Sequence, residues 1–198
     1  MKNQQQKRVD QVRREENAHK TDKVARQAFP DEEWVDAESL KFKHKGEDFE
    51  LPRDIGGIKV AKSRLTGLKD DERILTKEIK QGKILVDRGA TVYLLPKQKS
   101  LDGKNLPSPD ALVNGVLFEF KNITGGLNRV EIRFRQSRTQ CNNVYLKVDN
   151  TDISKGDVIS RIKSALRDKK YTGGSEGNLI VYLAQTKKSY FMLIEDLK

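Results

Sequence analysis

The stretch that decides the fold runs Pro109-Asp110-Ala111-Leu112-Val113-Asn114-Gly115-Val116-Leu117-Phe118-Glu119-Phe120-Lys121. Asn114-Gly115 between two apolar runs is the strongest short-range sequence signal for a two-residue β-hairpin. Such a turn fixes the register of the two strands. Val113 then pairs with Val116, and at the open end of the hairpin Asp110 pairs with Glu119.

The predicted register brings charges together on one face of the hairpin. Directly opposed residues have Cβ atoms about 4.5–5.5 Å apart, so the carboxylates of Asp110 and Glu119 would face each other. Lys121 follows Glu119 by two residues and lies on the same face. Like charges this close are destabilising unless a cation lies between them, and a divalent metal ion is the expected cation.

The other face of the hairpin is wholly apolar. It carries Ala111, Val113, Val116, Phe118 and Phe120. We expect this face to pack in the core and the charged end to open into a cleft. Two plainer interpretations stay open. Asp110 can be a turn residue after Pro109, and Glu119 with Lys121 can be the solvent face of an ordinary strand.

Composition narrows the class of protein. The chain has 198 residues and a formal net charge of +10, which favours polyanionic partners, nucleic acid first and anionic membrane surfaces second. No apolar run approaches the ~18 residues of a membrane span, and the N-terminus lacks the apolar segment of a signal peptide, so we expect a cytoplasmic protein. The single cysteine excludes internal disulfides, and two histidines argue against zinc proteases and histidine-based ribonucleases.

From about residue 70 the sequence alternates helical and strand patterns. The expected elements are a helix over 70–89, a strand over 91–95, the hairpin, a helix over 127–141, a strand over 143–148, a helix over 154–167 and strands over 179–183 and 190–194. This order predicts an α/β fold with an αβββαβ core, in which helices flank a mixed central sheet. Residues 1–30 are polar and rich in helix formers, so we expect a helical N-terminal extension.

The charged end of the hairpin suits phosphodiester hydrolysis. That reaction needs a hard cation to polarise the phosphate and to lower the pKa of the attacking water, and Mg²⁺ and Mn²⁺ prefer oxygen ligands. Asp110 and Glu119 supply two carboxylates, and the backbone carbonyl of Phe120 supplies a third oxygen. Lys121 would position or deprotonate the water.

Residues outside the hairpin complete the predicted site. The helix over 70–89 offers Glu78 as a further metal ligand or water-orienting group, and Glu72 is the second choice on that helix. Arginines on the helix over 127–141 are expected to be largely solvent-facing and to bind phosphate. The expected nucleic-acid contacts are Lys97, Lys99, Arg129, Arg133, Arg138 and Gln140. Contacts of this kind hold the nucleic-acid backbone with little base specificity.

The acidic hairpin and its surroundings resemble known nucleases. Pro109-Asp110 followed by Glu119-Phe120-Lys121 resembles the PD-(D/E)xK signature, and the element order of residues 70–148 resembles the core of that superfamily. Finer features resemble the C-terminal tRNase domain of CdiA-type contact-dependent inhibition toxins, which also occurs in phage and mobile-element proteins. These features are the helix from Glu78 to Gly89, the run Val92-Tyr93-Leu94-Leu95-Pro96, the Asn114-Gly115 hairpin and Gln140 before Asn143-Val144. The resemblance covers about residues 70–150.

The resemblance implies a metal-dependent endoribonuclease of toxin type. The residues implied as catalytic are Glu78, Asp110, Glu119 and Lys121. The implied cofactor is Mg²⁺, with Mn²⁺ or Zn²⁺ as alternatives, and the implied substrate is structured RNA, tRNA first. The implied partner is an acidic immunity protein in the producing cell.

The resemblance also bears on domain organisation and delivery. Residues 61–198 would form the nuclease domain, and residues 1–60 a basic helical extension and linker. Toxin domains of this family end long secreted chains that are delivered into target cells. This sequence instead begins with methionine and its own basic extension.

Two other functions stay open. The same site chemistry cuts DNA as well as RNA, so a DNA endonuclease of the same superfamily is the second hypothesis. The third is a non-catalytic nucleic-acid-binding or phage structural module, for which charge reversal at Asp110 would leave function intact. A rise in thermal stability with Mg²⁺ or Mn²⁺ separates enzyme from module, because a ligand that binds only the folded state stabilises that state.

Overall fold

The computed structural model describes residues 4–98, 106–168 and 170–198. The chain divides into two compact units, a first unit of residues 1–106 and 110–116 and a second unit of residues 107–109 and 117–198. The division runs through the predicted hairpin, so Asp110 belongs to the first unit and Glu119 to the second. The pairing of these two residues therefore stays a prediction, as does a domain boundary at residue 60.

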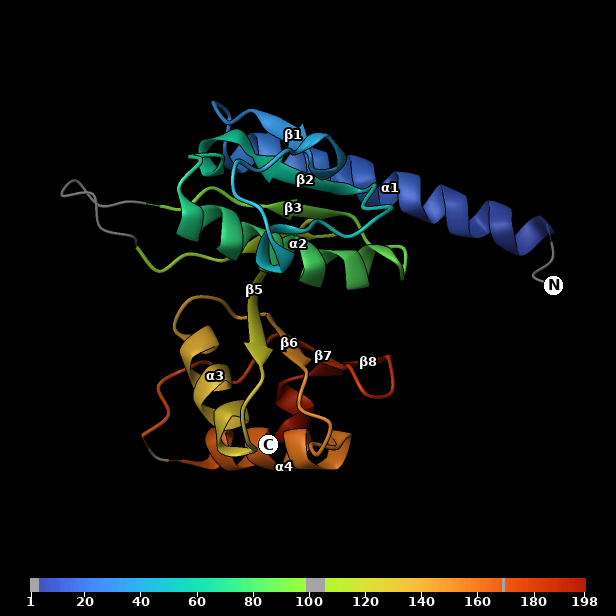
Figure 1. Ribbon diagram of the computed structural model, residues 1–198. Helices are drawn as coiled ribbons and strands as arrows, with labels where there is room; N and C mark the ends of the chain where they lie inside the picture. The colour runs from blue at the N-terminus through green and yellow to red at the C-terminus, as the bar shows by residue number, and fades with distance from the viewer. Residues whose placement is uncertain (1–3, 99–105, 169) are drawn as a thin grey trace. The chain divides into compact units, whose positions relative to one another are not determined.

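In its described residues the first unit has two long helices and four strands (Figure 1). Its elements are α1 (Gln4–Ala28), β1 (Trp34–Asp36), β2 (Ile58–Ala61), α2 (Lys69–Val86), β3 (Val92–Leu94) and β4 (Ala111–Val113), with 3₁₀ turns at Ala37–Ser39, Glu47–Phe49 and Lys62–Arg64. Strand β2 pairs antiparallel with β1 and parallel with β3, and β3 pairs antiparallel with β4. The strands of this unit are thus mixed in direction, as predicted.

Helices α1 and α2 pack on opposite faces of these strands. Successive residues of β3 alternate between faces. Val92 lies against Gly82 of α2, where an added Cβ would come within 3.4 Å of a Val92 methyl carbon. Tyr93 lies on the other face, in a buried cluster with Ala25 of α1. Glu78 precedes Gly82 by four residues and so lies on the sheet-facing side of α2.

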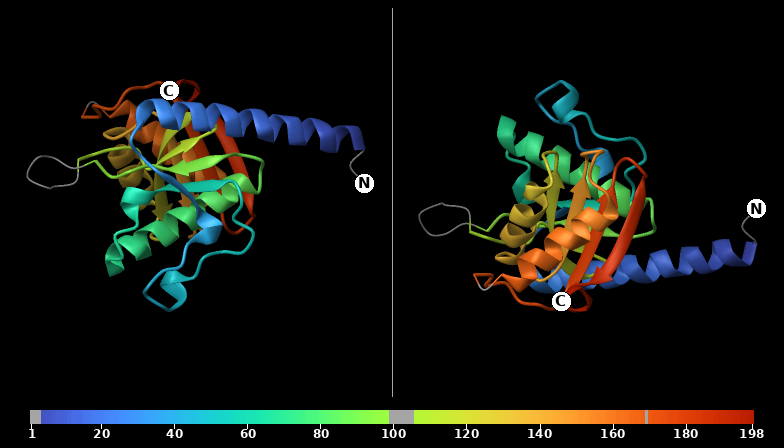
Figure 2. Two further views of the ribbon diagram at one scale, coloured as in Figure 1. Left: turned by 90° about the horizontal axis from the view of Figure 1, so that it is seen from above. Right: turned by 90° about the horizontal axis from the view of Figure 1, so that it is seen from below.

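The second unit also combines helices with mixed strands. Its elements are β5 (Val116–Ile123, whose first residue belongs to the first unit), α3 (Asn128–Arg138), β6 (Val144–Val148), α4 (Lys155–Arg167), β7 (Asn178–Leu183), β8 (Lys188–Leu193) and a 3₁₀ turn at Glu195–Leu197. Strand β6 pairs parallel with β5 and with β7, and β7 pairs antiparallel with β8. In the right panel of Figure 2, α4 lies across the strands of this unit.

The core of the second unit fixes which face of β5 meets the helices. Val144 and Leu146 of β6 are buried in one cluster with Phe134 of α3 and Ile162 of α4. In the parallel ladder Glu119 pairs with Val144, Lys121 with Leu146 and Ile123 with Val148. Partners in a ladder share a face, and Ile123 belongs to the same buried cluster. Glu119 and Lys121 therefore lie on the helix-covered face of β5.

The predicted two-residue turn is confirmed between β4 and β5. Asn114 has φ 51° and Gly115 has φ 78°, and positive φ at both positions defines the turn that matches the twist of a hairpin. The Asn114 side-chain oxygen accepts a hydrogen bond from the Thr91 N–H at 2.9 Å, and the Asn114 N–H donates to the Thr91 carbonyl at 3.0 Å. The turn is thereby fastened to the residue that precedes β3.

The predicted order of elements from residue 70 onward is confirmed, and so is the helical extension, which forms α1. Strand β1 and the 3₁₀ turns of residues 31–69 were not predicted, because short elements in that mixed segment lack a periodic apolar pattern. Among the described residues, no helix combines the length and the apolar character needed to span a membrane.

Candidate active site

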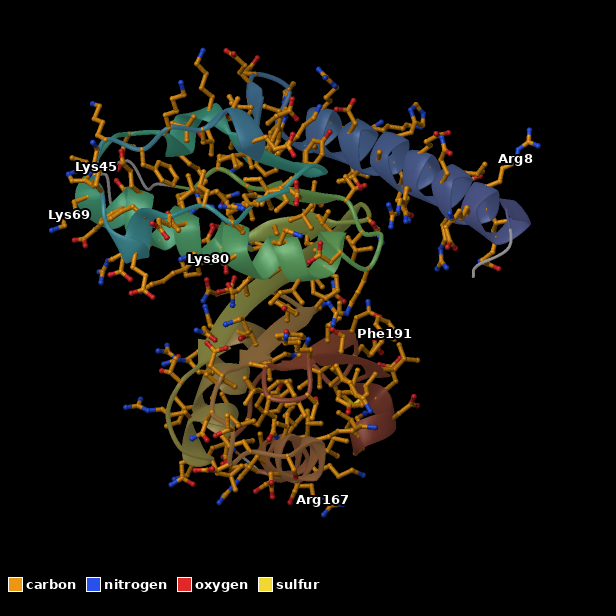
Figure 3. All side chains as sticks on the ribbon, turned by 45° about the vertical axis from the view of Figure 1, so that its right-hand side comes forward. Arg8, Lys45, Lys69, Lys80, Arg167 and Phe191 are labelled. Carbon is orange, nitrogen blue, oxygen red and sulfur yellow. The ribbon has the colours of Figure 1, made fainter. Side chains whose placement is uncertain are left out.

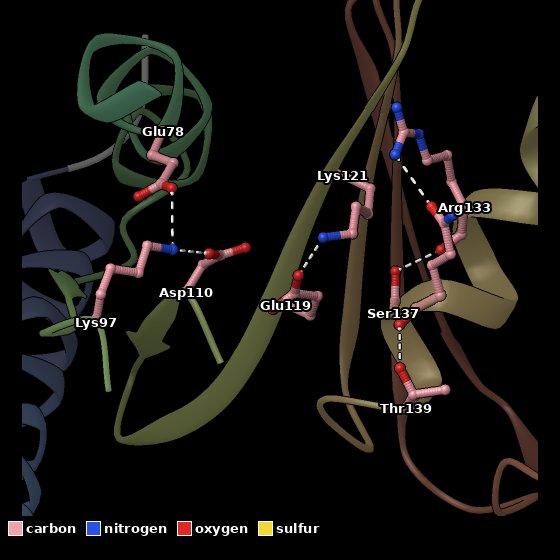
Figure 4. Close-up of polar contacts among 9 residues, drawn as sticks. Glu78, Lys97, Asp110, Glu119, Lys121, Arg133, Ser137 and Thr139 are labelled. Carbon is pink, nitrogen blue, oxygen red and sulfur yellow. Dashed lines mark hydrogen bonds and ion pairs between the residues drawn. The ribbon is translucent and has the colours of Figure 1, made fainter. Parts of the chain in front are cut away.

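Four charged side chains meet in the first unit, and we call them the first-unit cluster: Arg64, Glu78, Lys97 and Asp110. The Lys97 ammonium lies 2.7 Å from Asp110 Oδ1 and 3.5 Å from Glu78 Oε1, so it bridges the two carboxylates (Figure 4). The Arg64 guanidinium donates to the other carboxylate oxygen of Glu78. The structure thus brings together two of the acids that the sequence analysis singled out, Glu78 and Asp110.

Each member of the first-unit cluster is held by a different element. Arg64 closes the 3₁₀ turn after β2, and Glu78 is on the sheet-facing side of α2. The Leu95 N–H donates to the Asp110 carbonyl at 2.9 Å, which extends the pairing of β3 with β4 by one step. Asp110 is thereby placed beside Leu95, which precedes Lys97 by two residues. Sheet geometry therefore sets the distance between the lysine and its aspartate.

Burial makes the charges of this cluster interdependent. The side chains of Glu78 and Asp110 are each 9% exposed and that of Arg64 is 4% exposed, whereas that of Lys97 is 35% exposed. Buried ions are tolerated only when paired, and two cations here balance two carboxylates. Burial by itself would lower the pKa of Lys97, but the carboxylates of Glu78 and Asp110 prevail and raise it. Lys97 is therefore protonated at neutral pH.

Glu119 and Lys121 of β5 form a second charged group, which we call the second-unit pair. The Lys121 ammonium donates to Glu119 Oε1 (Figure 4), as expected for residues two apart on one strand face. Glu119 is only 1% exposed. The interpretation of this segment as the solvent face of an ordinary strand is therefore wrong. Phe120 points to the opposite face, where its ring meets Tyr145 edge-on with centroids 5.1 Å apart.

Glu72, the second choice on α2, has a structural role. Its carboxylate accepts hydrogen bonds from the backbone N–H groups of Lys43 and His44 at 3.1 and 3.0 Å, and lies 2.9 Å from His44 Nδ1. Burial would raise the pKa of Glu72, but these hydrogen bonds, led by that from the His44 backbone, prevail and lower it. Glu72 fastens the segment around residue 44 to α2 and is fully occupied there.

The predicted nucleic-acid contacts divide into exposed and buried residues. Arg129 and Arg133 of α3 are exposed, and Arg133 donates to the Gln136 side chain at 3.0 Å. Gln140, just beyond α3, is half-buried. Lys97 is occupied by carboxylates, and Lys99 lies outside the described residues. Further exposed cations include Lys45, Lys69 and Arg167 (Figure 3).

Arg138 is not the solvent-facing residue that helical spacing predicted. It is 5% exposed. Its guanidinium donates to the carbonyls of Asn142 and Gly174, to that of Glu176 at 2.8 Å and to the Tyr171 hydroxyl at 3.1 Å. The prediction failed because α3 ends at Arg138, and the following chain folds back over the side chain. Arg138 therefore joins the end of α3 to the segment that leads into β7.

Arg64 is the site residue that sequence reasoning missed. It lies in a short 3₁₀ turn, 14 positions before its partner Glu78, and no periodic pattern joins the two. The only available signal was the rule that a buried acid needs a cationic partner. That rule predicts that a partner exists and does not identify it.

The donor atoms of the first-unit cluster fit a hard divalent cation. The carboxylates of Glu78 and Asp110 converge on one positive charge, and Mg²⁺ or Mn²⁺ prefers such oxygen ligands. The cluster contains no cysteine or histidine, the ligands that Zn²⁺ favours. Across the described ranges 4–98, 106–168 and 170–198, no group of three or more His, Cys, Asp or Glu side chains is arranged to hold a metal ion.

A comparison with known protein families matches the segment that carries Asp110, Glu119 and Lys121. Residues 107–182 match the family model described as Contact-dependent growth inhibition CdiA C-terminal domain. The matched segment includes Asp110, Glu119 and Lys121 and reaches into β7, but it covers less than half of the chain and ends before β8. This match supports a toxin domain of the CdiA type. The comparisons with curated proteins and with solved structures gave no match.

Replacement of Glu72 by glutamine should make stability less dependent on pH. The pKa of Glu72 is lowered from its ordinary value near 4.5, so its contribution to stability is present above that value and is lost as the pH falls through the lower, folded-state pKa. Urea unfolding at pH 7 should show that Glu72→Gln is less stable than wild type, and the difference should shrink below pH 4. Glu50→Gln, an exposed position in the same unit, is the control. A deficit that stays constant with pH would contradict this assignment.

Substitution of two arginines of α3 should change the free energy of unfolding by very different amounts. Arg138→Met removes the donor for three backbone carbonyls, so we expect a loss of about 2 kcal/mol or more in unfolding free energy. Arg133→Met, on the exposed side of the same helix, should change stability by less than about 0.5 kcal/mol. Chemical denaturation of both variants measures the contrast, and equal effects would show that the carbonyl contacts of Arg138 are not stabilising.

Proposed function

We propose that this chain is a metal-dependent endonuclease that cleaves structured RNA, with tRNA as its substrate, and that it acts as a toxin of the contact-dependent inhibition type. One observation carries the proposal. Asp110 and Glu119-x-Lys121 fall inside the CdiA-type segment, and both acids are buried and bound to ammonium groups. Burial of a carboxylate costs free energy, and a non-catalytic module that binds through its surface does not require it.

The proposed roles follow from the chemistry of each group. Mg²⁺, or Mn²⁺ or Zn²⁺ in its place, would supply a Lewis acid and lower the pKa of the attacking water. Glu78 and Asp110 of the first-unit cluster are the ligands assigned to it, and Glu119 and the backbone carbonyl of Phe120 remain ligands predicted from the sequence. Lys121 now donates to Glu119 and would donate to the attacking water or to a phosphate oxygen.

Charge supports a polyanionic substrate. The net charge is +10, and Arg129 and Arg133 of α3 are exposed on the helix that covers the face of β5 carrying Glu119 and Lys121. Phosphate contacts of this type position a nucleic acid without reading its bases. Recognition of a folded RNA would then depend on its shape and its 2′-hydroxyl groups.

A cleavage assay tests the proposal. Purified protein would be mixed with total tRNA and with plasmid DNA, in Mg²⁺ or in EDTA, beside Asp110→Asn and Lys121→Met. We expect discrete tRNA fragments that require metal, with a loss of at least about 100-fold in each variant. Lys147→Met is the matched control. Lys147 lies on β6, the strand next to β5, and donates to Asp149 two residues further along the chain. This variant should cleave within about threefold of wild type.

The outcomes of this assay separate the functions. Cutting of DNA alone would replace RNA as the substrate. Salt-sensitive binding of both nucleic acids without cleavage of either would overturn the enzyme and indicate a binding module. Loss of cleavage in Lys147→Met to the same degree would show that any disturbed strand pair impairs the fold.

A nuclease that attacks cellular RNA must be restrained where it is made. We therefore include an acidic immunity protein in the proposal, since a basic surface favours an acidic partner. Expression of the wild-type gene alone should reduce host growth, whereas expression of Asp110→Asn should not. Normal growth with wild type, at protein levels equal to those of the variant, would count against a need for immunity.

A further inference from the structure

Lys97 holds the position that a metal ion would take in the first unit. Its ammonium lies 2.7 Å from an oxygen of Asp110 and 3.5 Å from an oxygen of Glu78. These are the two carboxylates of this unit that the proposed function assigns to the metal. One ammonium group already contacts both acids, and it is attached to the chain.

The two cations of the first-unit cluster differ in their freedom to leave. The Arg64 side chain is 4% exposed and the Lys97 side chain is 35% exposed. Arg64 donates to the Glu78 carboxylate oxygen that Lys97 does not use. Lysine also has a flexible four-carbon stem whose charged end can reach water. Of these two cations, Lys97 is therefore the one whose charged end can move into water.

An ammonium group and a divalent ion cannot both occupy this carboxylate pair. A unit positive charge within about 4 Å of a metal ion repels it strongly, even at the effective dielectric of a protein surface. The oxygens that Lys97 engages would also be the metal's ligands. Metal binding thus requires that Lys97 leave the carboxylates. The affinity for metal is therefore reduced by the free energy of the contacts that Lys97 makes with Glu78 and Asp110.

We propose that Lys97 is a tethered counter-cation of the catalytic carboxylates, which keeps Glu78 and Asp110 paired in the metal-free protein and is displaced when a divalent ion binds. This inference rests on the proposed function, because it uses the same acids. It also gives Lys97 a second role. Once displaced, its ammonium remains next to the metal-bound carboxylates and is free to bind a phosphate oxygen of the substrate, the role that the sequence predicted for it.

The test measures Mn²⁺ binding directly, by calorimetry and by the rise in melting temperature. Lys97→Met should bind Mn²⁺ at least tenfold more tightly than wild type, a change of about 1.4 kcal/mol. Without metal it should melt at a lower temperature, because two buried acids lose a partner, and Mn²⁺ should reverse the loss. Lys97→Arg keeps the charge and should bind as weakly as wild type. Lys97→Gln retains a hydrogen-bond donor and repeats the test should Lys97→Met not fold.

Two controls locate the effect. Lys62→Met removes the same charge from an exposed pair with Glu33 in the same unit, and its Kd for Mn²⁺ should equal that of wild type. Lys97→Met combined with Asp110→Asn should lose the tight binding, because one of the two ligands is gone. Tight binding in either control would place the metal elsewhere and overturn the inference.

Failure of the inference and failure of the proposed function give different results. If wild type and Lys97→Met bind Mn²⁺ with the same Kd while wild type cleaves tRNA only with metal, the nuclease stands and the counter-cation role of Lys97 is wrong. If neither protein binds Mn²⁺, both the role of Lys97 and the metal-dependent nuclease are overturned. If only Lys97→Met binds Mn²⁺ and wild type cuts no nucleic acid, Lys97 is confirmed as the competing cation and the metal-dependent enzyme is overturned.

Discussion

A carboxylate removed from water needs a positive charge beside it, and this constraint shapes both units. In the first unit Glu78 and Asp110 share Lys97, and Arg64 supplies a second cation. In the second unit Lys121 serves Glu119. Removal of one partner leaves an uncompensated buried charge, which is far more costly than the absence of the whole pair. The strands and helices around these residues are therefore arranged around charge pairs as much as around apolar packing.

Sequence reasoning succeeded where the signal is local. The Asn114-Gly115 turn, the strand alternation around Glu119 and the order of helices and strands from residue 70 were all predictable, because each depends on neighbours a few residues apart. The helix over 70–89 was expected, and it does carry Glu78 to the sheet. Strand β1 and the 3₁₀ turns of residues 31–69 were missed, since three-residue strands and 3₁₀ turns leave no period to recognise.

The candidate site was only half predictable for a related reason. The acids and Lys121 stand out in the sequence because the predicted hairpin register places them on one face. Their counter-charges come from distant positions, such as Arg64 for Glu78, and no spacing rule joins residues from separate elements. Lys97 illustrates the same difficulty. A lysine in a polar loop normally indicates a solvated charge, yet the end of β3 places it over two acids. Glu72 failed as a candidate because backbone N–H donors from the segment around residue 44 had already engaged it.

The contacts of Arg138 have a consequence for how this fold can vary. Three of its acceptors are backbone carbonyls, those of Asn142, Gly174 and Glu176. Every amino acid carries such a carbonyl, so these bonds do not depend on which side chains positions 142 and 176 carry, whereas a Cβ at position 174 would come within 3.3 Å of the guanidinium. Among the four acceptors named for Arg138, only the Tyr171 hydroxyl belongs to a side chain that could covary with the arginine. Methods that infer contacts from paired substitutions would therefore detect little of this junction, although it fixes the path of the chain into β7.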